Sequence, residues 1–380
     1  MERTELKAWL RLTLTPGVGN DSARKLLAAF GSAEGVFEQN DAALRQLGSD
    51  KLVRAVTAEP PKLAELYQAT LDWLAGSAER AVAPIGSPLY PAALLDIEDP
   101  PLVLYMIGSQ LKRWQAASQS IANNLAIVGS RNPTPQGEAN ARQFARAFAE
   151  QGLCIVSGLA LGVDGAAHDG ALQGAPEGGC ATIAVVGTGL DRVYPKKHLP
   201  LAHRIAKNGL IISEFPIGTP PIDANFPKRN RIISGLSLGT LVVEAALQSG
   251  SLITARLASE QGKDVFAIPG SIHSPQSRGC HYLIKQGAKL VETAQDVMEE
   301  LKIPLAQTSR PAPLLADEDA APEGGSTFLS ALGFDIVSLD ALQARTGLPT
   351  PELQAKLFEL ELDGVVTRLP GGLFQRLSRG

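Results

Sequence analysis

The chain has 380 residues, of which 44% are hydrophobic and 19% charged, and this composition is typical of a soluble globular protein with two or three domains. It contains no run near the roughly 20 apolar residues of a membrane span, and its start lacks a signal peptide's apolar core, so we expect a cytoplasmic protein without a membrane partner. The net charge of −4 gives no global sign of nucleic-acid binding, although a local basic groove can still attract a polyanion.

Residues 1–80 are predicted to form a small helical domain. Helical periodicity covers residues 5–12, 20–30, 41–47 and 61–73. The turn Pro16-Gly17-Val18-Gly19 resembles that of a helix–hairpin–helix unit, in which glycine amides approach DNA phosphates, but a structural turn in a bundle has the same pattern. We therefore predict a SAM or helix–hairpin–helix-like domain without assigning it a role.

Residues 81–303 are predicted to form a Rossmann-like α/β domain with a doubly wound, mostly parallel sheet. Short, proline-punctuated runs over 81–105 indicate a strand-bearing extension at its start. Beyond it, continuous apolar runs such as Leu125–Val128 and Leu153–Val156 alternate with helical patterns, as in a parallel sheet covered on both faces. Ligands of such sheets bind beyond the carboxyl ends of the strands. Glycine, proline or a polar residue follows nearly every predicted strand: Gly129, Ser157, Gly187, Ser213, Glu244 and Pro269.

The last part of the chain is predicted to be a linker and a small domain. Residues 304–327 are rich in proline, alanine and acid and have no periodicity, so they indicate a linker. Residues 328–380 have helical patterns followed by a short hairpin, which is typical of a winged-helix domain. Its helix at 350–362 has more acidic residues than its single lysine, so we expect protein contact or packing there, and no DNA readout.

The signatures of several enzyme classes are missing. The first strand of the α/β domain is followed by GSRNPTPQG and not by G-x-G-x-x-G, and no acidic residue ends the second strand, which excludes a typical dinucleotide site. No P-loop, HExxH or G-x-S-x-G motif occurs. Cys154, Cys180 and Cys280 have no CxxC spacing, which argues against a zinc site or a disulfide framework. We expect no cofactor, no metal and no catalytic residue.

Cationic residues follow at least three of the predicted strand ends. They are Arg131, Arg192, Lys196, Lys197, Lys228, Arg229 and Arg231. In addition, Ser249-Gly250-Ser251 opens a helix, and amides at a helix start favour an anion. Taken singly, any one of these cations is equally consistent with an ordinary solvent-exposed surface charge. If they converge on one rim, however, they are suited to a run of phosphates and not to a single nucleotide.

Eight motifs occur in order along the α/β domain: GSR at 129–131, SGLALGVDGAAH at 157–168, YPKKH at 194–198, SEFP at 213–216, FPKRNRIISGLS at 226–237, VVEAALQSGSLITA at 242–255, AIPGS at 267–271 and RGCHYLIKQGA at 278–288. With them, segment 125–303 resembles the DprA/Smf family of DNA-processing proteins. The resemblance implies a homodimer that binds single-stranded DNA, protects incoming DNA and loads RecA recombinase onto it during natural transformation.

The resemblance also implies roles for individual residues. Those expected at phosphates are Arg131, Lys196, Lys228, Arg229, Asn230 and Arg231. Tyr194 or Phe226 would stack a base. Those expected to shape or line the pocket are Ser130, Ser157, Gly158, Asp164, Ser249, Gly250 and Ser251. His198 and His281 depart from the family pattern, which usually has asparagine at these positions.

Two other classes of function are open at this point. Gly239-Thr240 and then Glu244 resemble the GT-x-x-x-E element of nucleotide phosphoribohydrolases of the lysine-decarboxylase-like group. The preceding residues 234–238, SGLSL, lack the diglycine of the PGG-x-GT loop that those enzymes carry. A scaffold that binds proteins through its ends and has a vestigial central site is the third class. If the chain is a DNA binder, Glu244 is expected to be a structural anchor.

Overall fold

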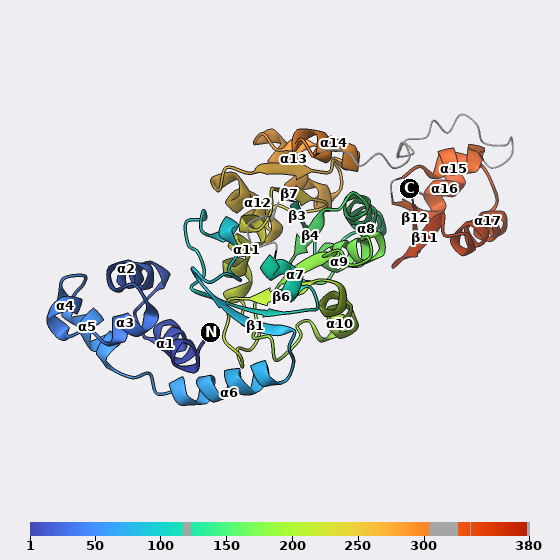
Figure 1. The fold of residues 1–380 in the computed structure, drawn as a ribbon. Helices are drawn as coiled ribbons and strands as arrows, with labels where there is room; N and C mark the ends of the chain where they lie inside the picture. The colour runs from blue at the N-terminus through green and yellow to red at the C-terminus, as the bar shows by residue number, and fades with distance from the viewer. Residues whose placement is uncertain (117–122, 304–325, 335, 378–380) are drawn as a thin grey trace.

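A sheet of nine strands forms the centre of the described structure (Figure 1). The coordinates, a computed structural model, describe residues 1–116, 123–303, 326–334 and 336–377. The strand order is β1-β2-β6-β5-β4-β3-β7-β8-β9. The bounds are β1 Arg80–Pro84, β2 Val103–Ile107, β3 Asn124–Val128, β4 Cys154–Ser157, β5 Thr182–Val185, β6 Leu210–Ser213, β7 Gly239–Val242, β8 Asp264–Ala267 and β9 Lys289–Leu290. From β3 onward the strands are parallel, and β1 and β2 form an antiparallel edge, so the predicted mostly parallel sheet is confirmed.

Helices cover both faces of this sheet because its central strands are apolar on both sides. In β3, Leu125 and Ile127 pack with α8 and α9, whereas Ala126 and Val128 pack with α11 on the other face. The bounds of the helices are α7 Leu111–Ala116, α8 Pro135–Glu150, α9 Val163–Gly174, α10 Leu199–Asn208, α11 Asn225–Gly235, α12 Ser251–Glu260, α13 Arg278–Lys285 and α14 Ala294–Glu300. The short 3-10 helices of this part of the chain are η1 Ala92–Leu94, η2 Lys196–His198 and η3 Pro275–Ser277.

The direction of winding changes beside β3. The chain runs outward from β3 through β4 and β5 to β6, and then returns through α11 to β7 on the other side of β3. The connections that follow β3 and β7 therefore diverge from each other. In doubly wound sheets this switch point leaves a crevice at the carboxyl ends of the strands, where ligands bind.

The amino-terminal part is helical, as predicted, and its core continues into the sheet edge. Its helices are α1 Arg3–Leu14, α2 Asn20–Phe30, α3 Ala33–Phe37, α4 Asp41–Arg45, α5 Asp50–Thr57 and α6 Leu63–Ala75. The ring of Trp73 in α6 meets that of Tyr105 in β2 edge to face, with 6.1 Å between the ring centroids. Of these helices, α6 lies along the antiparallel end of the sheet (Figure 1).

The carboxyl-terminal part has the predicted winged-helix arrangement. It contains α15 Ser326–Leu332, β10 Val337–Ser338, α16 Leu339–Thr346, α17 Thr350–Leu362, β11 Val366–Leu369 and β12 Leu373–Arg376, and its sheet has the order β10-β12-β11. Leu342, Leu353 and Phe374 belong to its separate core. The predicted linker 304–327 lies outside the described residues up to residue 325, and α15 begins at Ser326. Within the described parts of the chain, the helices are too short or too polar to span a membrane.

Candidate nucleic-acid interface

A cavity of about 490 Å³ opens at the switch point, at the carboxyl ends of β3 and β7. Its walls come from the loop after β3, the first turns of α9 and α11, and the start of α12. The predicted site residues that line it are Ser130, Arg131, Phe226, Arg229, Asn230, Ser249, Gly250 and Ser251. Segments from four separate parts of the sequence therefore meet at one place.

The loop after β3 is held tightly against the neighbouring elements. The amide of Ser130 donates to the carbonyl of Glu244 over 2.7 Å, and its carbonyl accepts from the amide of Val163 over 3.1 Å. A Cβ on Gly129 would lie 2.8 Å from that Glu244 carbonyl and equally near Val163, so the approach needs glycine. The loop presents Arg131 as an exposed side chain at the cavity wall.

The start of α12 supplies polar groups without fixed charge. The hydroxyls of Ser249 and Ser251 lie 2.7 Å apart, and Asn230 donates from Nδ2 to the carbonyl of Gly250 over 3.3 Å. The first amides of a helix lack partners within it and lie at the positive end of its dipole. The amides of Leu252 and Ile253 already donate to the carbonyls of Ser249 and Gly250, so the groups left for a phosphate oxygen are the hydroxyls, at the positive end of the helix dipole.

Arg229 forms the floor of the cavity and is only 5% exposed. It donates from Nη1 to the carbonyls of Gly158 and Val185, and from Nε to Oδ1 of Asn230. Its Nη2 lies 3.9 Å from Oδ2 of Asp164. Burial lowers the pKa of Arg229 to about 10, against the opposing effect of the Asp164 charge. The guanidinium thus remains a cation at neutral pH, anchored on the side away from the cavity.

Gly158 and Asp164 contact the Arg229 guanidinium, and Ser157 precedes Gly158 in the chain. A Cβ on Gly158 would collide with the guanidinium, so the glycine makes room for it. Ser157 is fully buried and donates to the carbonyl of Ile127 over 2.7 Å. Asp164 accepts from the amide of Ala160 over 3.3 Å, as expected of a hydrogen-bond anchor, and burial raises the pKa of its carboxyl group. Asp164 lines the cavity, whereas Ser157 and Gly158 lie behind the wall.

The other two cations of the basic cluster lie on a different face of α11. Arg231 makes two hydrogen bonds to the Glu214 carboxylate, of 2.6 and 2.8 Å, and Lys228 lies 3.4 Å from the same carboxylate. Arg229 therefore lines the cavity, whereas Lys228 and Arg231 do not. The helix begins at Asn225, before the cluster, and each residue is rotated by roughly 100° from the last. Positions 228 and 231 consequently share a face that 229 does not.

Two aromatic rings lie beside the cavity. Phe226 lines it, and the ring of Tyr194 packs on Phe226 with 5.5 Å between the centroids and 33° between the planes. The Arg131 guanidinium is 5.7 Å from the Phe226 centroid. Tyr194 is 46% exposed, so part of its side chain faces solvent beside the cavity. Lys196 follows on η2 and is exposed, but it does not line the cavity.

Glu244 is a structural anchor. Its carboxylate accepts from the amide of Thr134 over 2.9 Å and from the hydroxyl over 2.6 Å, at the start of α8. A carboxylate there also interacts favourably with the helix dipole. Burial raises the pKa of Glu244, and the two bonds to Thr134 oppose that effect.

Several lining residues were not predicted from the sequence. They are Asn132, Ala160, Gln248, Thr254 and Gln276. Gln276 lies in η3 and donates to the carbonyl of Asn132 over 3.0 Å, which joins two distant loops. Ala160, Gln248 and Thr254 lie within motifs of the sequence analysis but were not singled out there, whereas Asn132 and Gln276 lie in loops outside these motifs. The two histidines that depart from the family pattern contact backbone: His198 lies 3.0 Å from the carbonyl of Leu159, and His281 3.0 Å from that of Gly270.

Two family models match the chain. The model described as DNA recombination-mediator protein A matches residues 81–302, and that of the DprA winged helix domain matches residues 310–372. Protein Smf of Escherichia coli K12 is 41% identical over 321 residues, which make up 82% of this chain and 81% of the relative. The DNA processing protein DprA of Streptococcus pneumoniae is 46% identical over 214 residues, or 56% of this chain and 71% of the relative.

Solved structures of DNA processing protein A also match the chain. The X-ray structure of DprA from Streptococcus pneumoniae matches with a TM-score of 0.62 and 36% identity, and covers 79% of this chain and 98% of that one. A structure of DNA processing protein A from Helicobacter pylori, described in terms of its single-stranded DNA binding mode, matches with a TM-score of 0.52 and 31% identity. That match covers 60% of this chain and 98% of the other.

Proposed function

The chain belongs to the DprA family of DNA-processing proteins, and we propose that it binds single-stranded DNA in the cavity at the carboxyl ends of β3 and β7. The observation that carries this proposal is the meeting of four kinds of group in one crevice. An exposed arginine (Arg131), an anchored one (Arg229), the start of α12 and the Tyr194–Phe226 ring pair lie at or beside it. The Helicobacter pylori relative is described as a single-stranded DNA binder, which supports the same conclusion.

Each group has a distinct part in the proposed binding. Arg131 would pair with a phosphate at the wall, and the hydroxyls of Ser249 and Ser251 would donate to another phosphate oxygen. Arg229 would give the floor a positive potential without leaving its carbonyl partners. The outer face of Tyr194 would stack a base, a contact that every base can make. Binding by these groups would tolerate any sequence and weaken steeply with salt.

A flexible strand should bind better than a duplex. Phosphates and bases must reach a recessed cavity and an adjacent aromatic face at the same time. A single strand can turn its bases out, whereas a duplex has them paired and stacked. In a competition assay with equal masses of the two DNAs, we therefore expect unlabelled single strands to displace a bound labelled oligonucleotide more effectively than unlabelled duplex does.

The wider role that we propose is the protection of incoming DNA and the loading of RecA recombinase onto it during natural transformation, by a homodimer in the cytoplasm. Relatives from Streptococcus pneumoniae and Bacillus subtilis are named DNA processing proteins, which supports a role in DNA processing. Delivery of RecA and self-association rest on the family resemblance. A pull-down of RecA with and without oligothymidylate, and sedimentation of the purified chain, test them.

We propose binding without catalysis. The carboxylate of Glu244 is occupied by Thr134 at the start of α8, which supports an anchoring role for the residue. Incubation with adenosine monophosphate tests this assignment. Sustained release of adenine that Glu244→Gln abolishes would show that the cavity belongs to a nucleotide-cleaving enzyme.

Arg131→Ala tests the DNA site with little risk to the fold, because Arg131 is exposed. Binding of oligothymidylate measured across a salt series should weaken by roughly 5- to 10-fold, and the salt slope should fall by about 0.7, as for one lost phosphate contact to a single strand. Arg146→Ala is the matched control, because Arg146 is 58% exposed and pairs with Glu150 near the far end of α8. Equal affinities and slopes for both variants would refute the assignment of Arg131.

A further inference from the structure

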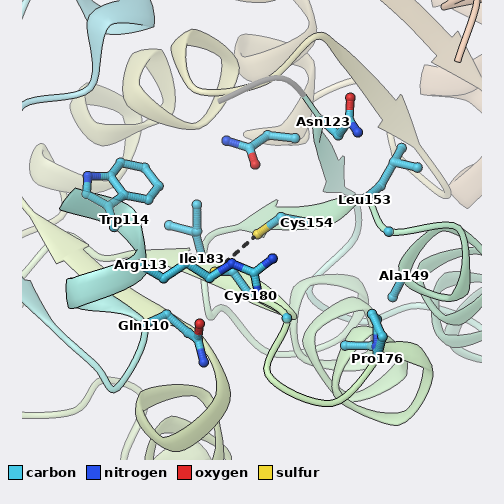
Figure 2. Close-up of a pocket in the computed structure, with 14 residues that line it drawn as sticks. Gln110, Arg113, Trp114, Asn123, Ala149, Leu153, Cys154, Pro176, Cys180 and Ile183 are labelled. Carbon is cyan, nitrogen blue, oxygen red and sulfur yellow. Dashed lines mark hydrogen bonds between the residues drawn. The ribbon is translucent and has the colours of Figure 1, made fainter. Parts of the chain in front are cut away.

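Two of the three cysteines lie in contact although 26 positions separate them. Cys154 is the first residue of β4, and Cys180 lies in the loop two residues before β5. Their sulfur atoms are 3.7 Å apart, and the dashed line in Figure 2 marks this contact. Cys280 is separate and buried in α13.

The register of the sheet creates this contact. Ile155 pairs with Thr182 across the parallel strands β4 and β5, and the amide of Ile155 donates to the carbonyl of Ala181 over 3.2 Å. Cys154 directly precedes Ile155, and Cys180 lies in the loop two residues before Thr182, so the chain brings the two thiols close together. Both pack with the same core cluster on one face of the sheet. A disulfide requires the sulfurs to approach to about 2.05 Å. Cys180 follows Gly178 and Gly179, whose permissive backbone allows the loop to make this small adjustment.

Both thiols open onto a cavity of about 320 Å³ that is distinct from the candidate DNA site. It lies at the amino ends of β3, β4 and β5, whereas the DNA cavity lies at the carboxyl end of β3. Arg113 and Trp114 of α7 line it together with the cysteines (Figure 2). Arg113 also donates to the carbonyl of Gly178, which fixes a cation beside the loop of Cys180.

We propose that Cys154 and Cys180 form a reversible disulfide when a low-molecular-mass disulfide, such as glutathione disulfide, enters this cavity. The thiolate of Cys180 attacks one sulfur of glutathione disulfide, and the first glutathione leaves as a thiolate. The thiolate of Cys154 then attacks the Cys180 sulfur of the mixed disulfide and releases the second glutathione. The two protein thiols are oxidised, one glutathione disulfide is reduced to two glutathiones, and the two protons go to these products.

The order of attack follows from the contact between the thiols. Cys154 donates its S–H to the Cys180 sulfur and is only 8% exposed, whereas Cys180 is half-buried. That hydrogen bond, together with burial, raises the pKa of the Cys154 thiol well above its usual value. Cys180 is therefore the thiol that meets the oxidant. Cys154 is the resolving thiol.

The bridge would enclose a segment that supports the DNA cavity. The chain between the two cysteines contains β4, Gly158, Asp164 and all of α9. A cross-link across it restricts the unfolded chain, so the oxidised protein should melt at a higher temperature than the reduced one. Dithiothreitol should reverse the difference.

The test uses the full chain equilibrated in glutathione buffers of increasing oxidising strength. After an acid quench, the protein is denatured, labelled with N-ethylmaleimide and analysed by intact and peptide mass spectrometry. The reduced protein should take up three maleimides, one for each cysteine, and the oxidised protein one, on Cys280. A peptide pair joined through Cys154 and Cys180 should appear in the same samples.

The cysteine variants separate the two steps. Cys154→Ser should hold one glutathione on Cys180, because the resolving thiol is gone, and Cys180→Ser should form no adduct on Cys154. Cys280→Ser is the control that retains the pair and should form the bridge normally. Three maleimides in the most oxidising buffer, or a lasting glutathione adduct on the wild-type chain, would overturn the proposal. Because no DNA is used, neither result bears on the DNA site.

Discussion

The two faces of α11 have cations of the same kind but use them differently. Arg229 faces the cavity floor, where its carbonyl partners and Asp164 hold it. Lys228 and Arg231, on the other face, share the carboxylate of Glu214. Adjacent basic residues on a helix are therefore not one basic patch. We infer that the first face serves DNA and that the second fastens α11 to the loop after β6.

Removal of Arg231 should have the largest effect on stability. In Arg231→Ala the Glu214 side chain, which is 6% exposed, loses a bidentate partner and stays buried. Breaking a buried pair in this way costs about 3–5 kcal/mol, to be measured by urea unfolding. Arg204→Ala, which removes an exposed arginine paired with Asp169, is the matched control and should cost about 1 kcal/mol or less.

The double variant Arg231→Ala with Glu214→Ala should recover part of the loss, because no buried charge remains. Folded Arg231→Ala should bind oligothymidylate as the wild type does. Unchanged stability together with a collapse of DNA affinity would contradict the division between the faces, since it would place Arg231 at the DNA.

The buried histidine His168, which lies near Arg229, should make the free energy of unfolding fall at acid pH. His168 is fully buried, and its Nδ1 lies 2.7 Å from the hydroxyl oxygen of Thr182. Burial, with the nearby charges of His198 and Arg229, lowers the pKa of His168 to about 3. Between its ordinary value of 6.5 and 3, the unfolded chain binds a proton that the folded chain does not.

The contribution of His168 to the free energy of unfolding should therefore be constant above pH 6.5. Below pH 6.5 it should fall by roughly 1.4 kcal/mol per pH unit. Urea unfolding of the wild type and of His168→Asn from pH 7.5 to about 4.5 measures the difference in slope. The asparagine variant should lack this component of the pH dependence. Parallel slopes for the two proteins would show that His168 is protonated in the folded state.

Loss of the exposed ring should weaken DNA binding without affecting the fold. Tyr194→Ala removes a side chain that packs on Phe226 and is 46% exposed. Stacking on an aromatic residue contributes about 1–3 kcal/mol per base, so affinity should fall by roughly 5- to 150-fold in fluorescence anisotropy. Tyr194→Phe keeps the ring and should bind nearly as the wild type. If both variants bind normally, bases are held elsewhere.

Lys228→Ala should have the smallest effect. Lys228 is 49% exposed, and a surface ion pair such as that with Glu214 contributes about 0–1 kcal/mol. Affinity for oligothymidylate and its salt slope should be unchanged within error. A slope reduced by about 0.7, as for a lost phosphate contact, would show that the DNA path also crosses this face of α11.

Most of the fold could be predicted because the central strands are continuous apolar runs between helical patterns. The rule that ligands bind beyond the carboxyl ends of parallel strands then pointed to Ser130 and Arg131, which come shortly after β3, and the start of α12 pointed to Ser249. The antiparallel edge of β1 and β2 was not predicted, because short proline-punctuated runs do not define a pairing partner. Nor was the contact of Cys154 with Cys180, which depends on the register of β4 and β5.

The faces of α11 were missed for a physical reason as well. The composition of 226–231 is basic, but the helix start at Asn225 decides which side chain points where. The partner of Arg231 is Glu214, which lies 17 residues earlier and reaches the helix only in the folded chain. Buried ion pairs of this kind leave no periodic trace in the sequence.

Photo-crosslinking of single-stranded DNA is the most direct test of the proposed site. An oligothymidylate with one bromodeoxyuridine is bound to the full chain, irradiated and mapped by peptide mass spectrometry. The proposed stacking predicts crosslinks on Tyr194 or Phe226. Tyr194→Ala should remove the crosslinks on residue 194. Crosslinks confined to the amino-terminal helices or to the winged-helix domain would contradict a DNA site at the carboxyl ends of β3 and β7.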